Sequence, residues 1–168
     1  MIGQGKQAIL LRKYAPARRE FFLYPTHEFA RRKDHLDRFQ PRYREFVKEV
    51  ISSKPKKITE IKYYASIDET YHIERADLPS LANMAGLYIW TPEHVTGYFS
   101  DSDEAFLWLL RVYRLSEPMR IPDLGRGAVT YANLRQPIST QGATDGITDR
   151  ITDSHMGCLD RMHDEDHT

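Results

Sequence analysis

The segment Ala105–Leu115, with the sequence AFLWLLRVYRL, decides the fold. It is the most apolar stretch in the 168 residues and is rich in residues that favour β-structure. A continuous apolar run of this length is typical of a strand that is covered on both faces. We therefore predict that this segment forms a central strand and anchors the core.

Further apolar segments predict the strands around it. Gln7–Lys13 (QAILLRK) and Glu20–Tyr24 (EFFLY) are short apolar runs separated by a loop, which predicts a hairpin. Apolar and polar residues alternate over Thr59–Asp68, as expected for a half-buried strand. Short strands are also expected at Tyr71–Glu74 and Ala128–Leu134, and the prolines and glycines from Pro118 onward predict a loop between 118 and 127.

Three helices are predicted from periodicity and end signals. After Pro41, apolar residues recur every three or four positions as far as Ile51, which predicts an amphipathic helix. A short helix is expected to begin at Asp77, and another has Thr91 as its N-cap. The predicted fold class is α+β, with a mixed or barrel-like sheet of about five to six strands and two to three short helices.

The predicted domain covers residues 1–139. A chain of this size buries enough surface to form a core without disulfides or metals. From about residue 140 the composition shifts to Thr, Asp, Gly, Ser and His with few large apolar side chains. Such a segment buries too little apolar surface to offset its conformational entropy. We therefore expect residues 140–168 to form a polar, acidic, disordered tail.

Composition also bears on location and chemistry. The single cysteine, Cys158, cannot form an intrachain disulfide, and no run of about 18 apolar residues occurs. These features predict a cytoplasmic protein without a membrane partner. None of the glycine-rich nucleotide motifs, zinc-protease motifs or nucleophile-elbow motifs is present. We therefore predict no cofactor and assign no catalytic residue.

The zero net charge of the chain conceals an internal split. Residues 1–63 carry 16 Lys and Arg against 7 Asp and Glu, whereas residues 64–168 carry 8 against 17. One interpretation is a basic surface that collects a polyanion, either nucleic acid or a phosphorylated ligand. The other interpretation is that the basic and acidic halves neutralise each other within the fold. The sequence leaves both open.

Candidate anion-binding residues are cations of the basic half, aromatic residues near them, and two arginines of the central strand. Cations contact phosphates, and aromatic rings stack on bases. Arg111 and Arg114 are included because a guanidinium on a buried strand needs a carboxylate, a carbonyl or a ligand anion. The candidates are Lys6, Arg12, Lys13, Tyr24, His27, Arg31, Arg32, Trp90, Arg111 and Arg114, with Lys33 beside them.

Two other functions stay open. Glu60 and Lys62 form an E-x-K pair on one strand face, as in metal-dependent nucleases, where an upstream Asp34 or Asp37 would complete the site. The other is a regulatory module that binds a protein partner. A zinc site is not predicted, although His155, Cys158, His163 and His167 have a possible ligand spacing, because this segment carries no packing aromatic residue.

Several motifs in order suggest a family. They are GKQAILLRK at 5–13, FLYPT at 22–26, Ile89-Trp90, LLRVYRL at 109–115, Ile121-Pro122 and QPIST at 136–140. Over about residues 3–140 the chain resembles the bacterial and archaeal domain of unknown function 1802. The resemblance implies an α+β domain of unassigned activity. Members of that family begin with a further segment and carry a glycine-rich turn after LLRK, so we expect the start of this chain to be truncated or its first element to be missing.

Overall fold

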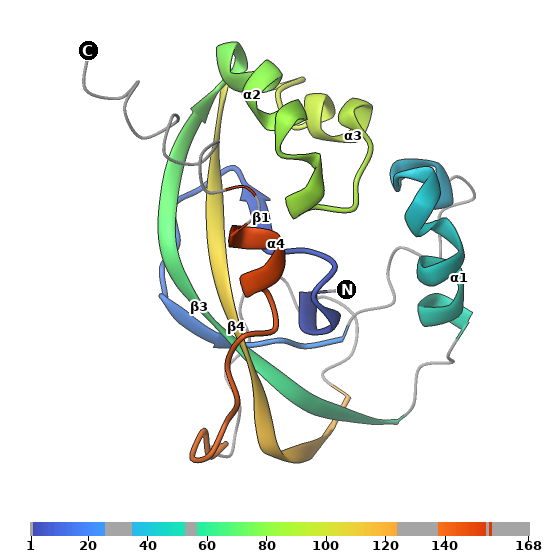
Figure 1. The fold of residues 1–168 in the computed structure, drawn as a ribbon, viewed down its shortest axis with the longest axis vertical. Coiled ribbons are helices and arrows are strands. Elements are labelled where there is room, and N and C mark those ends of the chain that lie inside the picture. The colour runs from blue at the N-terminus through green and yellow to red at the C-terminus, as the bar shows by residue number, and fades with distance from the viewer. Residues whose placement is uncertain (1, 26–34, 53–56, 124–137, 154, 156–168) are drawn as a thin grey trace.

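The computed structural model describes residues 2–25, 35–52, 57–123, 138–153 and 155 (Figure 1). Within them the chain is α+β, and its strands form one four-stranded antiparallel sheet in the order β1-β4-β3-β2. The strands are β1 Ile9–Arg12, β2 Glu20–Phe22, β3 Ile58–Glu74 and β4 Glu104–Pro122. The α-helices are α1 Arg44–Ser52, α2 Leu78–Asn83, α3 Pro92–Gly97 and α4 Asp149–Asp153. The 3-10 turns are η1 Ile2–Gln4, η3 His35–Arg38, η4 Pro41–Tyr43, η5 Arg75–Asp77 and η6 Ala85–Leu87.

The predicted central strand is confirmed. Strand β4 lies between β1 and β3 and pairs with both in antiparallel orientation. Its alternate side chains enter two different clusters: Leu107 and Leu109 pack in the largest core cluster, whereas Trp108 and Leu110 pack in a second one. Both faces of this segment are therefore covered, as its continuous apolar sequence predicted.

The predicted hairpin between the first two strands is wrong. Strand β1 pairs with β4, where Ile9 is opposite Leu109, and β2 pairs with β3, where Phe21 is opposite Ala65. The two strands thus lie at opposite edges of the sheet. The physical reason is that β1 buries residues on both of its faces, because Leu11 enters the main cluster while Leu10 packs against the second. Strand β4 supplies both contacts, through Leu107 and Leu109 in the main cluster and Trp108 and Leu110 in the second.

The long strands β3 and β4 extend beyond their predicted limits. The two segments expected at Thr59–Asp68 and Tyr71–Glu74 form one strand, with a register shift between Ile67 and Glu69. Strand β4 continues to Pro122. The prediction that residues from Pro118 onward form a loop is therefore wrong for residues 118–122. Residues 115–118 have no partner on β3 and stand opposite Lys62. Pro118 therefore needs no ladder donor at this irregularity.

The expected count of five to six strands is not confirmed. Fusion of two predicted strands into β3 lowers the count, and the predicted strand at Ala128–Leu134 lies outside the described residues. The sheet is antiparallel rather than mixed. In Figure 1, β3 and β4 form a long curved pair, and α1, α2, α3 and α4 lie on the inner side of the curve.

The three predicted helices are confirmed, and the cap of α3 follows the sequence signals. The Thr91 hydroxyl accepts a hydrogen bond from the backbone N–H of His94 at 3.2 Å, and Pro92 follows at the first helical position. At α1, Val47 is buried and Phe46 is partly buried against the main cluster. No helix in the described ranges is long and apolar enough to cross a membrane.

The packed part of the chain extends past the predicted boundary at residue 139. Thr144 forms an isolated antiparallel bridge with Arg114. Thr148 is buried, and its hydroxyl donates a hydrogen bond to the carbonyl of Leu110 at 3.2 Å. The disorder expected from residue 140 therefore does not describe residues 140–153. Backbone bridging to Arg114 and two partly buried isoleucines, Ile147 and Ile151, join the segment to the rest of the fold.

Candidate functional site

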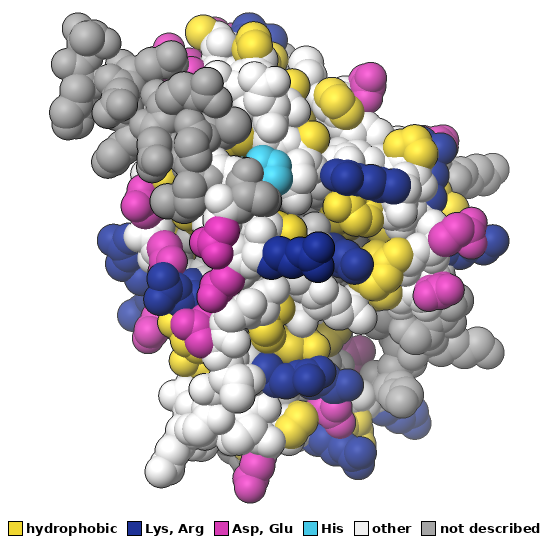
Figure 2. All heavy atoms as spheres, viewed as in Figure 1, with side chains coloured by type: hydrophobic (Ala, Val, Ile, Leu, Met, Phe, Trp, Pro, Cys, Tyr) yellow, Lys and Arg dark blue, Asp and Glu magenta, His cyan; other side chains and the backbone are white. Residues whose placement is uncertain are grey.

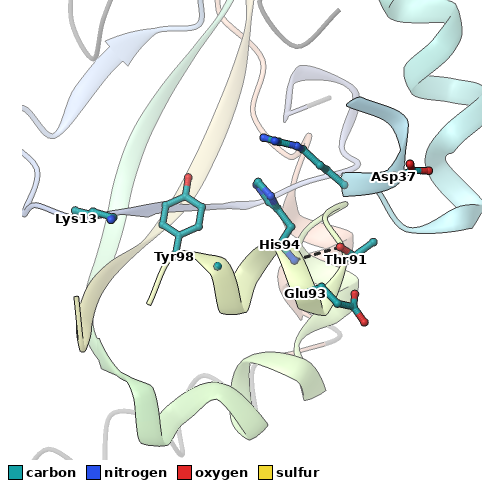
Figure 3. A pocket seen from close by; sticks show the side chains of 8 residues that line it. Lys13, Asp37, Thr91, Glu93, His94 and Tyr98 are labelled. Carbon is teal, nitrogen blue, oxygen red and sulfur yellow. Dashed lines mark hydrogen bonds between the residues drawn. The ribbon is translucent and has the colours of Figure 1, made fainter. Parts of the chain in front are cut away.

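A cleft of about 460 Å³ opens between the end of β1, η3 and α3 (Figure 3). Two of its lining residues, Lys13 and Arg38, are cations, and His94 and Tyr98 come from α3. Figure 3 shows His94 and Tyr98 on the side of α3 that faces Lys13, whereas Glu93 points away from them. The complete lining is Lys13, Asp37, Arg38, Thr91, Glu93, His94, Gly97 and Tyr98.

The charge of this cleft is mixed. Asp37 and Glu93 line it together with the two cations. Lys13 is also engaged, because its ammonium donates a hydrogen bond to the Asp101 carboxylate. That hydrogen bond lowers the pKa of Asp101 below its ordinary value. A ligand phosphate would therefore have to compete with carboxylates at this place.

Trp90 lies beside this cleft but belongs to the core. It is buried, its ring stacks on Tyr88 at a centroid distance of 6.0 Å, and it is 6.1 Å from the ring of His94. His94 in turn meets Tyr98 edge to face at 5.9 Å. The tryptophan thus supports α3 and leaves little ring surface for a base.

A second arrangement lies where the N-terminal segment meets η4 and α1. The Lys6 ammonium is 5.9 Å from the centre of the Phe46 ring. The Arg42 guanidinium is 4.7 Å from the centre of the Tyr43 ring. Neither cation makes an ion pair with a carboxylate of the described residues. Both instead lie over aromatic rings that are partly buried against the main cluster.

Arg114, one of the predicted candidates, forms the same kind of contact. Its guanidinium carbon is 5.7 Å from the centre of the Tyr63 ring, and its Nη2 donates to the Tyr63 hydroxyl at 3.4 Å. It too has no ion pair with a described Asp or Glu. We call Lys6, Arg42 and Arg114 the ring-held cations.

Contacts join the ring-held cations into one series. Tyr43, the last residue of η4, and Phe46 of α1 are three residues apart in one continuous helical stretch, so they are neighbours on its surface. Lys6 links Phe46 to the N-terminal segment. Gly3 lies so close to Tyr63 that a Cβ at this position would be 2.4 Å from the ring carbon Cδ2. The series therefore runs from Arg42 through Lys6 to Arg114.

Figure 2 shows how charged and hydrophobic side chains are distributed over one face of the molecule. Down its middle, Lys and Arg side chains follow one another among hydrophobic side chains, whereas on its left they are interspersed with Asp and Glu. Sequence analysis missed Arg42 because the spacing of the helix after Pro41 placed it on a solvated helix face. The adjacent Tyr43 was the available signal, since a ring next to an arginine permits stacking.

Other cations are held by carboxylates. Arg111 donates from Nε to Asp68 at 3.1 Å, and its Nη1 is 3.9 Å from Asp145. The negative charge of Asp68, followed by a hydrogen bond to Tyr113, raises the pKa of Arg111 above its ordinary value. Arg111 is exposed rather than buried, and a carboxylate satisfies it. We call Lys13, Lys62, Arg75, Arg111 and Arg120 the carboxylate-held cations.

The remaining candidates are not part of the series of Lys6, Arg42 and Arg114. Arg12 also lies over a ring, with its guanidinium carbon 5.9 Å from the centre of the Trp108 ring, but it is on β1 and its Nη1 donates to the carbonyl of Leu11. Tyr24 is at the far end of the sheet, where its hydroxyl donates to the Asp123 carboxylate. Four further residues lie outside the described residues: His27, Arg31, Arg32 and Lys33.

The E-x-K pair is present on β3, but the Glu60 carboxylate is already paired with cations of the protein. Lys62 Nζ is 3.1 Å from Glu60, and Arg120 Nε is 3.5 Å from the other oxygen of the same carboxylate. The hydrogen bond from Lys62 is the largest of the effects that lower the pKa of Glu60. No group of three His, Cys, Asp or Glu suited to a metal occurs among the described residues, which include Asp37 and His155 but not Asp34, Cys158, His163 or His167.

These observations define an α+β protein with a long antiparallel strand pair and a series of ring-held cations beside it. The chain belongs to the family described as Domain of unknown function (DUF1802), whose family model matches residues 1–151. The resemblance seen in the sequence is thereby confirmed, and the match extends into the first residues of α4. Neither the curated proteins nor the solved structures contain a match.

Proposed function

We propose that this protein binds a polyanion, namely nucleic acid, through the ring-held cations Lys6, Arg42 and Arg114, and that it does so without catalysis. One observation carries the proposal. These three side chains lie over aromatic rings and have no carboxylate partner in the described residues, whereas the five carboxylate-held cations each have one.

The partner of a cation determines its availability to a phosphate. A carboxylate already supplies a full opposing charge, so a phosphate gains little by replacing it. An aromatic ring attracts a cation more weakly, by about 0.5–1 kcal/mol at exposed sites, and leaves its net charge in place. The ring-held cations therefore present uncompensated positive charge in fixed positions.

A small phosphorylated ligand is the alternative within this proposal, and its natural place is the cleft beside Lys13 and Arg38. Two features favour nucleic acid instead. Asp37 and Glu93 line the cleft, so its charge is mixed. The ring-held cations form a series that a chain of phosphates can follow, rather than a single pocket.

The test uses a matched pair of triple variants. Lys6→Ala/Arg42→Ala/Arg114→Ala removes one lysine and two arginines from rings, and Lys62→Ala/Arg75→Ala/Arg120→Ala removes one lysine and two arginines from carboxylates. Affinity for a mixed-sequence oligonucleotide is measured by fluorescence anisotropy at several salt concentrations. Both proteins are first checked for an unchanged circular dichroism spectrum.

We expect the slope of log K against log salt to be about −2 for the unmodified protein, since about 0.7 per phosphate is expected for single strands. The ring triple variant should lose at least about tenfold in affinity and most of that slope. The carboxylate triple variant should stay within about threefold. Equal losses in the two variants, or no salt-dependent binding at all, would overturn the proposal.

A further inference from the structure

We infer that the nucleic acid bound at the ring-held cations is single-stranded, with bases stacked on the guanidinium planes of Arg42 and Arg114 and a phosphate beside Lys6. This inference rests on the proposed function and specifies its ligand. It follows from how the two guanidinium groups are held and from the order of the three side chains.

Arg42 is fixed in orientation by contacts on one side. Its guanidinium lies over Tyr43, its Nε donates to Gln40 Oε1 at 3.1 Å, and its Nη2 donates to the carbonyl of Ala85 at 3.4 Å. The residue is nevertheless exposed. A planar cation whose edge is bonded and whose inner face is covered presents its outer face to solvent. Nucleobases stack on such planes.

Arg114 repeats this arrangement at the other end of the series. Tyr63 lies under its guanidinium and accepts a hydrogen bond from its Nη2. The backbone of Arg114 is paired with Thr144 on one side and with Tyr63 of β3 on the other. This pairing fixes the position of the Cα atom from which the side chain extends. This residue is also exposed. A second stacking plane is thus built on two strands rather than on a loop.

Lys6 stands between the two arginines in the series. Its ammonium is a compact charge on a flexible stem, suited to a phosphate and unsuited to stacking. Along the series, the planar guanidinium of Arg42 is followed by the compact charge of Lys6 and then by the planar guanidinium of Arg114. A single strand alternates bases and phosphates along its length and can place both on such a surface, because its bases are free to turn outward.

A duplex fits this surface less well. It keeps its bases inside and offers phosphates, and proteins read it with a basic helix or ribbon placed in a groove. Among the described helices, α1 carries the exposed residues Glu45 and Glu49 beside Lys48, and α4 carries Asp149 and Asp153 beside Arg150. Neither helix has the uniformly basic side that a groove requires.

The experiment separates base stacking from charge. The variant Arg42→Lys/Arg114→Lys keeps both charges and removes both planes, and Arg75→Lys/Arg120→Lys is its matched control on carboxylate-held arginines. Each protein is titrated with a single strand of about 12 nucleotides, a length within known single-strand sites, with the duplex of the same sequence, and with a heparin fragment of similar charge. Thermal unfolding of each variant checks the fold.

We expect the unmodified protein to prefer the single strand over the duplex by about tenfold, and the Arg42→Lys/Arg114→Lys variant to lose about tenfold for the single strand but less than about twofold for heparin. The control variant should lose nothing. Equal binding of single strand and duplex, or an unaffected lysine variant, overturns the inference and leaves the proposed function standing. Absence of binding to all three polyanions overturns both.

Discussion

Two sets of cations in this molecule differ in what holds them. Lys6, Arg42 and Arg114 lie over the rings of Phe46, Tyr43 and Tyr63. Arg111 and Arg75 instead meet Asp68 and Asp103 at 3.1 and 2.9 Å. The difference teaches that the charge of a segment is a poor guide to its function, because the partner of each side chain decides whether its charge is available.

For the arginines on β4, the residue opposite on β3 explains the difference. On the β3/β4 ladder, Glu60 stands opposite Arg120, and Ser66, two residues before Asp68, stands opposite Arg111. Carboxylates are therefore cross-strand neighbours of these arginines. At Arg114 the opposite residue is Tyr63. Lys13 and Asp101 form a pair between the basic and acidic halves, so neutralisation within the fold is real but does not reach the ring-held cations.

The largest effect is expected from removal of a ring. Tyr63→Ala takes away the ring that holds Arg114 and contacts Gly3, and Tyr64→Ala removes its neighbour, which stacks on Tyr113 at a centroid distance of 4.5 Å. Both variants should lower the free energy of unfolding by about 2 kcal/mol, because both rings are partly buried. Only Tyr63→Ala should weaken nucleic-acid binding, by about tenfold.

Urea unfolding and anisotropy titrations measure these two quantities. If Tyr64→Ala weakens binding as much as Tyr63→Ala, the loss reflects general destabilisation. The ring beneath Arg114 then has no specific role in binding.

A smaller effect is expected at the N-terminal segment. Gly5 has a φ of +65°, and a Cβ there would be 2.6 Å from the carbonyl oxygen of Ile147. Gly5→Ala should therefore cost about 2 kcal/mol of stability and, by displacing Lys6, weaken binding about threefold to fivefold. Gly97→Ala is the control, since a Cβ there meets nothing within 4 Å. An unchanged unfolding midpoint in Gly5→Ala would show that the segment is not held as described.

Removal of carboxylates should raise the affinity for nucleic acid instead of lowering it. Asp68→Asn/Asp145→Asn and Asp101→Asn release Arg111 and Lys13, respectively, from their exposed ion pairs. Each released cation adds weakly to the attraction of a polyanion, so affinity should rise by about twofold at low salt and not at high salt. A fall in affinity in either variant would mean that these carboxylates support the binding surface rather than neutralise it.

The smallest effect concerns pH at the Lys13–Asp101 pair. The hydrogen bond from Lys13 lowers the pKa of Asp101. A carboxyl with a lowered pKa contributes stability above its unfolded pKa, and this contribution is lost as the pH falls through the folded value. Lys13→Ala should shift the NMR titration of Asp101 upward toward the ordinary pKa and, because it leaves the Asp101 charge uncompensated, lower nucleic-acid affinity by no more than about twofold at low salt. An unshifted titration would show that the pair does not form in solution.

The sequence predicted those elements of the fold that depend only on residues close together in the chain. The Thr91 cap, the helix after Pro41 and the central strand at Ala105–Leu115 all depend on neighbours in sequence, and all three are confirmed. The partner of β1 is set by contacts across the sheet, and no local residue encodes that choice. The same applies to the docking of the segment around Thr148, which depends on the Leu110 carbonyl.

The candidate surface was predictable only in part. Lys6 and Arg114 were selected from charge and from the apolar context of a strand, but Arg42 was not. Composition also could not tell that Arg111 would meet Asp68, because a register shift at that residue places its carboxylate beside the arginine. Which cations find a carboxylate and which find a ring is a property of the folded sheet.

One measurement tests the central claim within a single sample. Lysine acetylation, followed by mass spectrometry with and without a single-stranded oligonucleotide, compares Lys6 over Phe46 with Lys13 and Lys62, which are paired with Asp101 and Glu60. All three lysines are exposed. The account predicts that the oligonucleotide protects Lys6 and leaves the acetylation of Lys13 and Lys62 unchanged. Protection of Lys13 or Lys62 without protection of Lys6 would contradict it.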